Sequence, residues 1–214
     1  PLAKGSPLYV RVAKAGDTPV KGTAIDPSHI VRFTFGCCIS QFEKKAYHTT
    51  TMPVGEQVVL AQGFDECLSG LDYMSDIGHL AYVTGAAYDA PEGWSVSGTV
   101  TASIGYVRLA AKGVLTTPAL ASLGSTPTDI VVSFKAVVRC SSTDAIDKKE
   151  ITVQVAEGDG TVEAQPDMTG EFTKRDDCFT WRTFTVRVTG ATASTRLAFS
   201  NTGQWFLDDI VVTK

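Results

Sequence analysis

The 214 residues include 43% hydrophobic and 20% charged residues, so the chain can build a core and is not a disordered segment. The net charge of −4 comes without a basic stripe that could neutralise phosphates, which argues against nucleic acid as a partner. No apolar run approaches the length of a membrane span, so we expect no membrane insertion by this segment.

The first strands are expected at residues 8–13 and 29–35, joined by a connection that carries Gly, Asp and Pro. A polar stretch follows, with Lys44, Lys45 and a Thr-rich run up to Pro53, and it favours a linker or a crossing between modules. Residues 57–62 then predict another strand. We therefore divide the chain into a small N-terminal β segment, residues 1–55, and a main domain, residues 56–214.

Residues 63–98 are expected to be loop-rich, because scattered carboxylates mix there with Tyr73, Tyr82, Tyr88 and Trp94. A long irregular stretch in a compact domain is usually functional or mobile. Strands resume at residues 104–110 and 115–120.

The second half shows regular alternation of apolar and polar residues, which places one packed and one solvated face on each strand. The predicted strands are 129–139, 150–155, 181–188 and 195–200, separated by glycine-bearing turns. Helical periodicity is nearly absent. The pattern therefore predicts an all-β fold, an antiparallel β-sandwich.

The last stretch, residues 201–214, combines aromatic and branched residues with two adjacent acids. Plain alternation puts Asp209 on one face with Trp205, and Asp208 on the other face with Phe206. A carboxylate among large apolar groups is costly unless it is paired, hydrogen-bonded or bound to a cation. We expect this strand to close the sandwich and to carry its one demanding electrostatic feature.

The five cysteines are an odd number, so at least one is unpaired within the chain. None lies in a Cys-x-x-Cys pair or near a histidine at zinc spacing, which excludes a recognisable zinc site. Buried free thiols, with or without one disulfide, are favoured over a disulfide framework. The cysteines are Cys37, Cys38, Cys67, Cys140 and Cys178.

No catalytic motif is present: the chain has no Gly-x-Ser-x-Gly, no His-Glu-x-x-His and no phosphate-binding glycine loop. The three histidines, His29, His48 and His79, stand apart from one another. The acids near Asp147 lack the spacing of a jelly-roll glycosidase, and Asp176 and Asp177 are expected to be solvated. We predict that the protein is not an enzyme.

The order of short motifs in residues 57–214 resembles the jelly-roll sandwiches of bacterial surface proteins. These are the galactose-binding-like carbohydrate-binding modules and the related cleaved-adhesin and MAM-type domains, with particular similarity to modules of Bacteroidetes surface or secreted lipoproteins. Residues 1–55 are similar to the closing strands of a fibronectin-type-III-like module; a single extended sandwich is the alternative. The motifs are Gly93-Trp94, Leu115-Thr-Thr-Pro-Ala-Leu120, Ile130-Val-Val-Ser-Phe134, the strand before Gly158-Asp-Gly160, Trp181, Arg196-Leu-Ala-Phe199 and Phe206-Leu-Asp-Asp-Ile-Val211.

The resemblance implies a structural calcium ion. Its carboxylate ligands would come from Asp65 and Glu66 at the first family position and from Asp208 and Asp209 at the second. Calcium takes several oxygen ligands, and loop carbonyls could supply the remainder. In the alternative, the terminal acids accept backbone N–H bonds and hold no metal.

The resemblance also implies a carbohydrate-binding module without catalysis, with a polysaccharide or glycan and the neighbouring domains as partners. Its location would be extracellular or on the bacterial outer-membrane surface. Aromatic rings that stack on a pyranose and nearby polar groups would form the site. We expect Tyr82 and Tyr88 to be exposed and the tryptophans to serve the core first. The alternative is a protein–protein adhesion module with no glycan ligand. The candidate residues are Tyr82, Tyr88, Trp94, Trp181 and Arg182.

Overall fold

The computed structural model describes residues 7–11, 30–34, 51–67, 87–103, 105–139, 151–165, 168–173, 177–178, 180–201 and 203–214. Nearly all regular structure in these residues is β-strand, with short 3₁₀ segments that include η3 (Ala121–Leu123) and η4 (Thr169–Glu171). Strands β1 (Pro7–Arg11) and β2 (Ile30–Thr34) pair with each other in a two-stranded antiparallel sheet. The predicted boundary near residue 55 stays a prediction.

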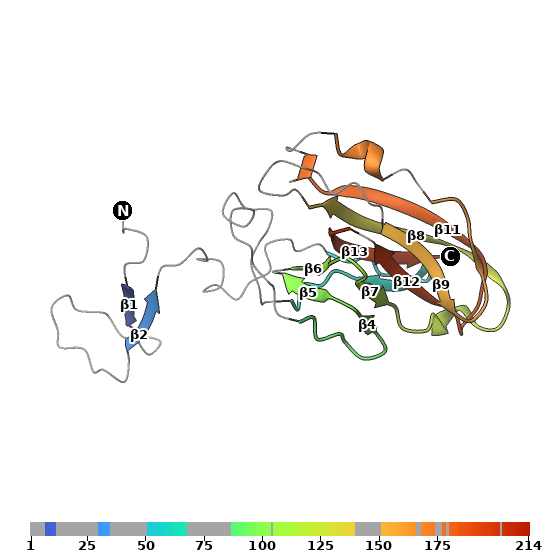
Figure 1. The fold of residues 1–214 in the computed structure, drawn as a ribbon. Helices are drawn as coiled ribbons and strands as arrows, with labels where there is room; N and C mark the ends of the chain where they lie inside the picture. Colours follow the sequence, from blue (N-terminus) through green and yellow to red (C-terminus); the bar gives the residue numbers. More distant parts are fainter. Residues whose placement is uncertain are drawn as a thin grey trace.

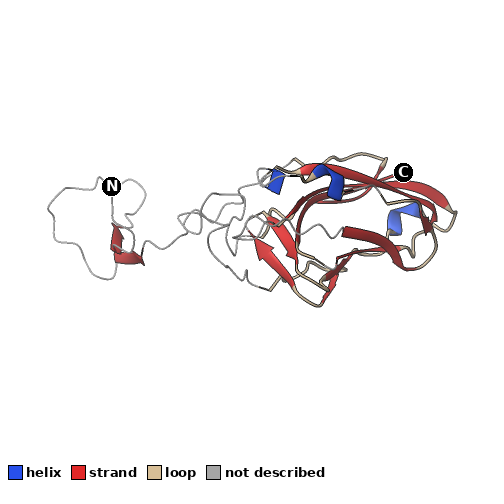
Figure 2. Ribbon diagram, turned by 45° about the horizontal axis from the view of Figure 1, so that its top comes forward, coloured by secondary structure: helices blue, strands red, loops and turns tan. Residues whose placement is uncertain are grey.

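The other strands form two antiparallel sheets that face each other as the layers of a sandwich (Figures 1 and 2). The larger sheet has the order β10-β11-β8-β13-β6-β5, with β3 also paired to β13, and the smaller has the order β4-β7-β12-β9. The predicted all-β antiparallel sandwich is confirmed. The bounds are β3 (Val58–Gln62), β4 (Ser95–Ser97), β5 (Val100–Ser103), β6 (Tyr106–Leu109), β7 (Val114–Thr116), β8 (Thr128–Val138), β9 (Ile151–Glu157), β10 (Thr161–Val162), β11 (Arg182–Ala191), β12 (Arg196–Asn201) and β13 (Trp205–Thr213).

From β6 onward the chain passes back and forth between the layers, which is the jelly-roll pattern. Strands β7, β9 and β12 belong to the smaller sheet, and β8, β11 and β13 belong to the larger one. As a result, strands that are close in sequence face each other across the core. Apart from the pair of β10 and β11, which are consecutive and adjacent in the larger sheet, their hydrogen-bonded neighbours come from distant parts of the chain.

The core lies between the layers and is built from the predicted apolar faces. On β8, the alternating side chains from Ile130 to Val138 are buried. The ring of Phe134 meets Phe199 of the opposite sheet at a centroid distance of 5.3 Å and an interplanar angle of 82°. A fully buried phenylalanine contributes about 1.5–3 kcal/mol by removal of apolar surface from water. Replacement of such a residue by alanine should therefore weaken the packing between the two sheets.

Three short strands, β4, β5 and β10, were not predicted. Strand β4 falls at the end of the stretch that the sequence indicated as loop-rich, and all three of its residues are exposed. An exposed Ser-Val-Ser segment carries almost no apolar pattern, so its strand conformation comes from pairing with β7. The central part of the loop-rich stretch, residues 68–86, lies outside the described residues.

Candidate functional site

The two terminal acids lie where β13 changes partners. On one side β13 pairs with β8, and on the other it pairs first with β6 and then with β3. The register with β8 shifts between Asp208 and Val211, where β13 carries one extra residue. Asp209 takes a positive φ of 46° there. A left-handed residue in one strand of an antiparallel pair is the mark of a β-bulge, and aspartate tolerates this conformation better than most residues.

Because of the bulge, the two acids do not follow the plain alternation that the sequence predicted for this strand. Asp208 lies opposite Lys135 of β8 in the register, and the carboxylate of Asp209 also reaches that lysine, with Oδ2 2.7 Å from Nζ. Both acids therefore lie beside one ammonium group, instead of on opposite faces. The two residues are 2% and 7% exposed. The expectation of a demanding, compensated carboxylate pair on the closing strand is confirmed.

The two acids are stabilised differently. Asp209 holds the ion pair with Lys135, while Asp208 accepts a hydrogen bond of 2.8 Å at Oδ1 from the backbone N–H of Asp209. Burial, followed by the charge of Asp209, raises the pKa of Asp208 to about 8, against the lowering effects of that hydrogen bond and of Lys135. Asp208 therefore holds a proton near neutral pH.

The other two predicted metal ligands follow β3. The pKa of Asp65 is raised by burial, then by the charges of Asp209 and Glu66, so these acids lie within electrostatic reach of one another. Glu66 instead accepts a 2.7 Å hydrogen bond at Oε1 from Gln62. Gly63 approaches Asp209 closely, since a Cβ added to this glycine would lie 3.5 Å from Oδ1 of Asp209.

These residues do not fit a calcium site in the part of the chain that the structure describes. No three acidic, histidine or cysteine side chains are grouped there closely enough to hold an ion. Lys135 supplies the positive charge that a cation would bring to Asp209. The hydrogen bond that Asp208 accepts from the backbone N–H of Asp209 matches the alternative in which the terminal acids accept backbone N–H bonds and hold no metal. Calcium stays a prediction, tested by the chelation experiment below.

The expected exposure of Tyr88 is wrong. This side chain is 5% exposed, its ring meets Phe64 edge-on at 5.8 Å, and its hydroxyl lies 3.5 Å from Oε1 of Glu66. A ring with no free face cannot stack on a sugar. Tyr82 lies outside the described residues, so its role stays a prediction.

The three tryptophans serve the core to different degrees. Trp205 is fully buried, and Trp94 and Trp181 are partly buried and pack against the core. Trp94 meets the ring of Phe64 at 6.0 Å, whereas Trp181 meets Tyr106 edge-on at 5.3 Å. Trp94 and Trp181 therefore keep some exposed surface while anchored by another aromatic ring.

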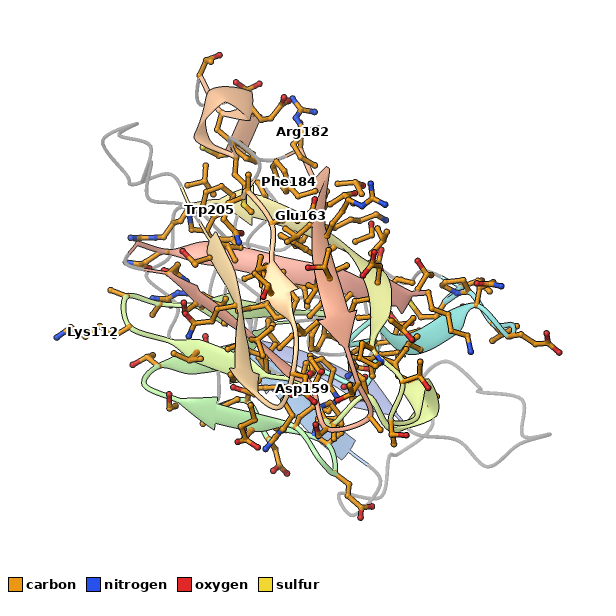
Figure 3. The ribbon with its side chains drawn as sticks, turned by 90° about the vertical axis from the view of Figure 1, so that its right-hand side faces the viewer. Lys112, Asp159, Glu163, Arg182, Phe184 and Trp205 are labelled. Carbon is orange, nitrogen blue, oxygen red and sulfur yellow. The ribbon has the colours of Figure 1, made fainter. Side chains whose placement is uncertain are left out.

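Arg182 begins β11 next to Trp181, at the end of the sandwich that carries η4, and Figure 3 shows it above the core residues Phe184 and Trp205. Its guanidinium lies 3.7 Å from Oδ1 of Asp177 and 3.9 Å from Oε2 of Glu171. Both distances exceed ordinary hydrogen-bond length. The side chain is 34% exposed although its Nε is buried, so this pairing is loose and partly open to water.

Asp177 departs from the expected solvated loop acid. It is buried, and its Oδ2 accepts hydrogen bonds from the backbone N–H and the hydroxyl of Thr173 at 2.9 and 3.2 Å. This acid fixes the loop that brings η4 to Arg182. Sequence reasoning also missed Lys135, because a lysine at a solvated position of a strand gives no sign of which acid lies opposite.

Trp94 has a different polar neighbourhood. Arg196, on β12, donates 2.8 Å hydrogen bonds to the carbonyl oxygens of Gly93 and Thr117 and contacts Glu157 at 3.3 Å. Its guanidinium therefore ties the loop before β4 to the smaller sheet. The donors of Arg196 are committed to the fold, unlike those of Arg182.

Two cysteines lie within the described residues. Cys178 is buried and disulfide-bonded. Cys67 is buried and free, and burial raises the pKa of its thiol to about 12, which makes it unreactive at neutral pH. Cys37, Cys38 and Cys140 lie outside the described residues, as do the three histidines. None of the helices described is long and apolar enough to cross a membrane.

No protein-family model matches the chain, and no curated protein matches it in sequence. Solved structures with a similar arrangement of strands include a carbohydrate-binding module of Cellvibrio mixtus lichenase 5A in complex with cellotriose (TM-score 0.36, 14% identity, 73% of this chain and 98% of that one). Others are the K3 cleaved adhesin domain of Lys-gingipain from Porphyromonas gingivalis (0.40, 15%, 73% and 99%) and CBM35 from Paenibacillus barcinonensis (0.36, 20%, 61% and 99%).

These structures are of the kinds that the sequence resemblance named, carbohydrate-binding modules and a cleaved adhesin domain. The similarity concerns the arrangement of strands, and the site of this chain is interpreted below from its own residues. A Bacteroidetes origin stays a prediction.

Proposed function

We propose that the chain is a non-catalytic carbohydrate-binding module of a bacterial cell-surface or secreted protein, with its site at Trp181 and Arg182. The observation that carries the proposal is the loose pairing of Arg182, which leaves a partly exposed cation beside a partly exposed indole. The sequence resemblance to carbohydrate-binding modules supplies the ligand class.

The chemistry of this pair suits a sugar. An indole presents an apolar face to the C–H side of a pyranose, and the ring of Tyr106 holds the indole in place from its edge. The guanidinium offers several N–H donors, and Glu171 offers acceptors that remain mostly exposed. Hydroxyl groups of a sugar could replace water at both groups without breaking a tight ion pair. Such a site needs few polar groups next to an apolar one.

The alternative position at Trp94 is less suitable. Its arginine, Arg196, already donates to two backbone carbonyl oxygens, so a ligand would have to compete with bonds that hold the fold. Recruitment of Arg196 by a sugar would release the loop before β4. Because the hydrogen bonds of Arg196 hold the fold and the ion pairs of Arg182 are loose, we place the binding site at Trp181.

A glycan-array screen followed by calorimetry tests the proposal. We expect one class of polysaccharide to bind, and Arg182→Gln to weaken its affinity at least tenfold, as expected for loss of charged hydrogen bonds. Arg187→Gln is the matched control, because Arg187 is an exposed arginine further along the same strand. Thermal melting of both variants shows whether the fold is intact.

Two results would contradict this function. One is the absence of binding to any glycan; the other is affinity that Arg182→Gln leaves unchanged. Binding of a protein partner without any glycan would favour the adhesion-module alternative. Release of reducing sugar from a bound polysaccharide would contradict the non-catalytic assignment.

A further inference from the structure

The cluster of Lys135, Asp208 and Asp209 places an amine, a carboxyl group and a second carboxyl group together on adjacent strands. Nζ of Lys135 and Oδ2 of Asp209 are 2.7 Å apart, and the register puts Asp208 directly opposite Lys135. The bulge at Asp209 creates this arrangement, since an unbroken strand would turn the two acids to opposite faces. The glycan proposal makes no use of these groups.

From this geometry we infer that Lys135 and Asp209 form an intramolecular isopeptide bond, with Asp208 as the group that relays the proton. The bond would link β8 to β13 by an amide between Nζ of the lysine and Cγ of the aspartate. This inference is independent of the proposed function and of any ligand.

The reaction balances without an oxidant or another reactant. Asp208 begins protonated: it gives its proton to a carboxylate oxygen of Asp209 and takes one proton from the Lys135 ammonium, and the neutral amine attacks Cγ of Asp209 to form the C–N bond. A second proton passes from the nitrogen to the same oxygen as its C–O bond breaks, and that oxygen leaves as water. One hydrogen remains on the amide nitrogen and two leave in the water. Asp208 ends protonated, as it began.

The fold supplies the two conditions that this condensation needs. The first is proximity: groups held in contact react as if at effective concentrations of about 10⁵ M or more, which offsets the unfavourable condensation in water. The second is exclusion of water from the electrophile, since Asp209 is 7% exposed. Lys135 is 38% exposed along its side chain, which gives the released water a path to solvent.

Intact-mass measurement of the purified full chain tests the inference directly. After reduction of disulfides and denaturation, we expect a mass about 18 Da below that of the sequence, equal to one water. Proteolysis should then yield one branched peptide that joins the segments around Lys135 and Asp209. This readout needs no variant, so it does not depend on whether a substituted chain folds.

Two variants separate the isopeptide from a cyclic imide at an aspartate, which also loses one water. Lys135→Arg keeps the positive charge but should show the full sequence mass, whereas an imide would survive this change. Asp208→Asn keeps the size of the side chain but removes the relay, so the linked fraction should form at least tenfold more slowly. A full mass for the unsubstituted chain, or a missing water that persists in Lys135→Arg, would overturn the inference.

Discussion

Among the residues that the structure describes, we compare two clusters of one cation and two carboxylates, which differ in the distances between their charges and in their contact with water. In the β13 cluster, Lys135 contacts a carboxylate at 2.7 Å, and both acids are buried. In the end cluster, Arg182 lies 3.7 and 3.9 Å from its acids, and Glu171 is largely exposed. The first cluster sits at the centre of the larger sheet, and the second sits at the end of β11, beside η4 (Figure 3).

The difference shows how burial decides what the same charges can do. Charges removed from water must satisfy one another, so the β13 cluster is fixed and contributes to structure or internal chemistry. Charges that keep contact with water interact weakly and exchange partners easily, so Arg182 and Glu171 of the end cluster can accept an external ligand. Composition alone does not distinguish the two.

The largest expected difference between the clusters is in the free energy of unfolding that is lost when the cation of each is replaced. Lys135→Met should lower the free energy of unfolding by about 3 kcal/mol, because two buried acids lose their positive neighbour. Arg182→Met should lower it by less than about 1 kcal/mol, because its ion pairs are long, Glu171 is exposed, and the buried Asp177 keeps its two hydrogen bonds from Thr173. Urea unfolding at neutral pH measures both variants, and equal losses would contradict the distinction between the clusters.

The pH dependence of stability separates the clusters next. The pKa of Asp208 is raised from 3.8 to about 8, so the folded state keeps a proton that the unfolded chain releases. Its contribution to stability is complete below about pH 4 and is lost as the pH rises through about 8. The neighbouring charged groups that set this pKa are Asp209, Lys135 and Asp65.

In the ion-paired form, we expect a fall of about 3 to 4 kcal/mol in the free energy of unfolding between pH 5 and pH 8. Asp208→Asn should flatten this dependence, since an amide does not titrate and its oxygen can still accept the N–H of Asp209. Urea titrations across this pH range measure the slope. An identical slope in the variant would assign the dependence to another group.

A smaller effect is expected from the exposed acid of the end cluster. Glu171→Gln should change the free energy of unfolding by less than about 0.5 kcal/mol, because exposed ion pairs contribute little. The same change should weaken binding of the glycan found in the array screen, if Glu171 accepts a hydroxyl. A large loss of stability would show that this pair is structural, like the one on β13.

The smallest expected effect is that of a chelator. Because Lys135 supplies the charge at Asp209, excess chelator should move the melting temperature by less than about 1 °C. An ion that binds only the folded protein stabilises it by mass action, so its removal would lower the melting temperature clearly. Such a decrease would support the calcium ligands predicted from the sequence.

Much of the sandwich could be predicted because its strands alternate regularly. Ile130, Val132 and Phe134 of β8 follow a period of two, and their burial follows from that period. The bulge could not be predicted in this way. It depends on which residue of β8 lies opposite each acid, and a one-residue insertion leaves no mark in the sequence of β13 alone.

The candidate site was predicted in part. Arg182 and Trp181 were expected near ligand, and both keep exposed surface at a strand end. Tyr88 was misjudged because a tyrosine in a loop is usually exposed, whereas here Phe64 covers its ring. Contacts between residues so far apart in sequence are set by the fold, and local composition carries no information about them.

The position of β13, between β8 on one side and β6 and β3 on the other, also affects how the chain folds during synthesis. The three strands that pair with β13, namely β3, β6 and β8, are synthesised before it. The larger sheet cannot join β8 to β6 and β3 until residues 205–213 have left the ribosome, because β13 lies between them. Pairings between such distant segments form slowly, because a long loop must close first. The nascent chain therefore waits with unpaired strand edges, a period in which chaperones would find their binding sites.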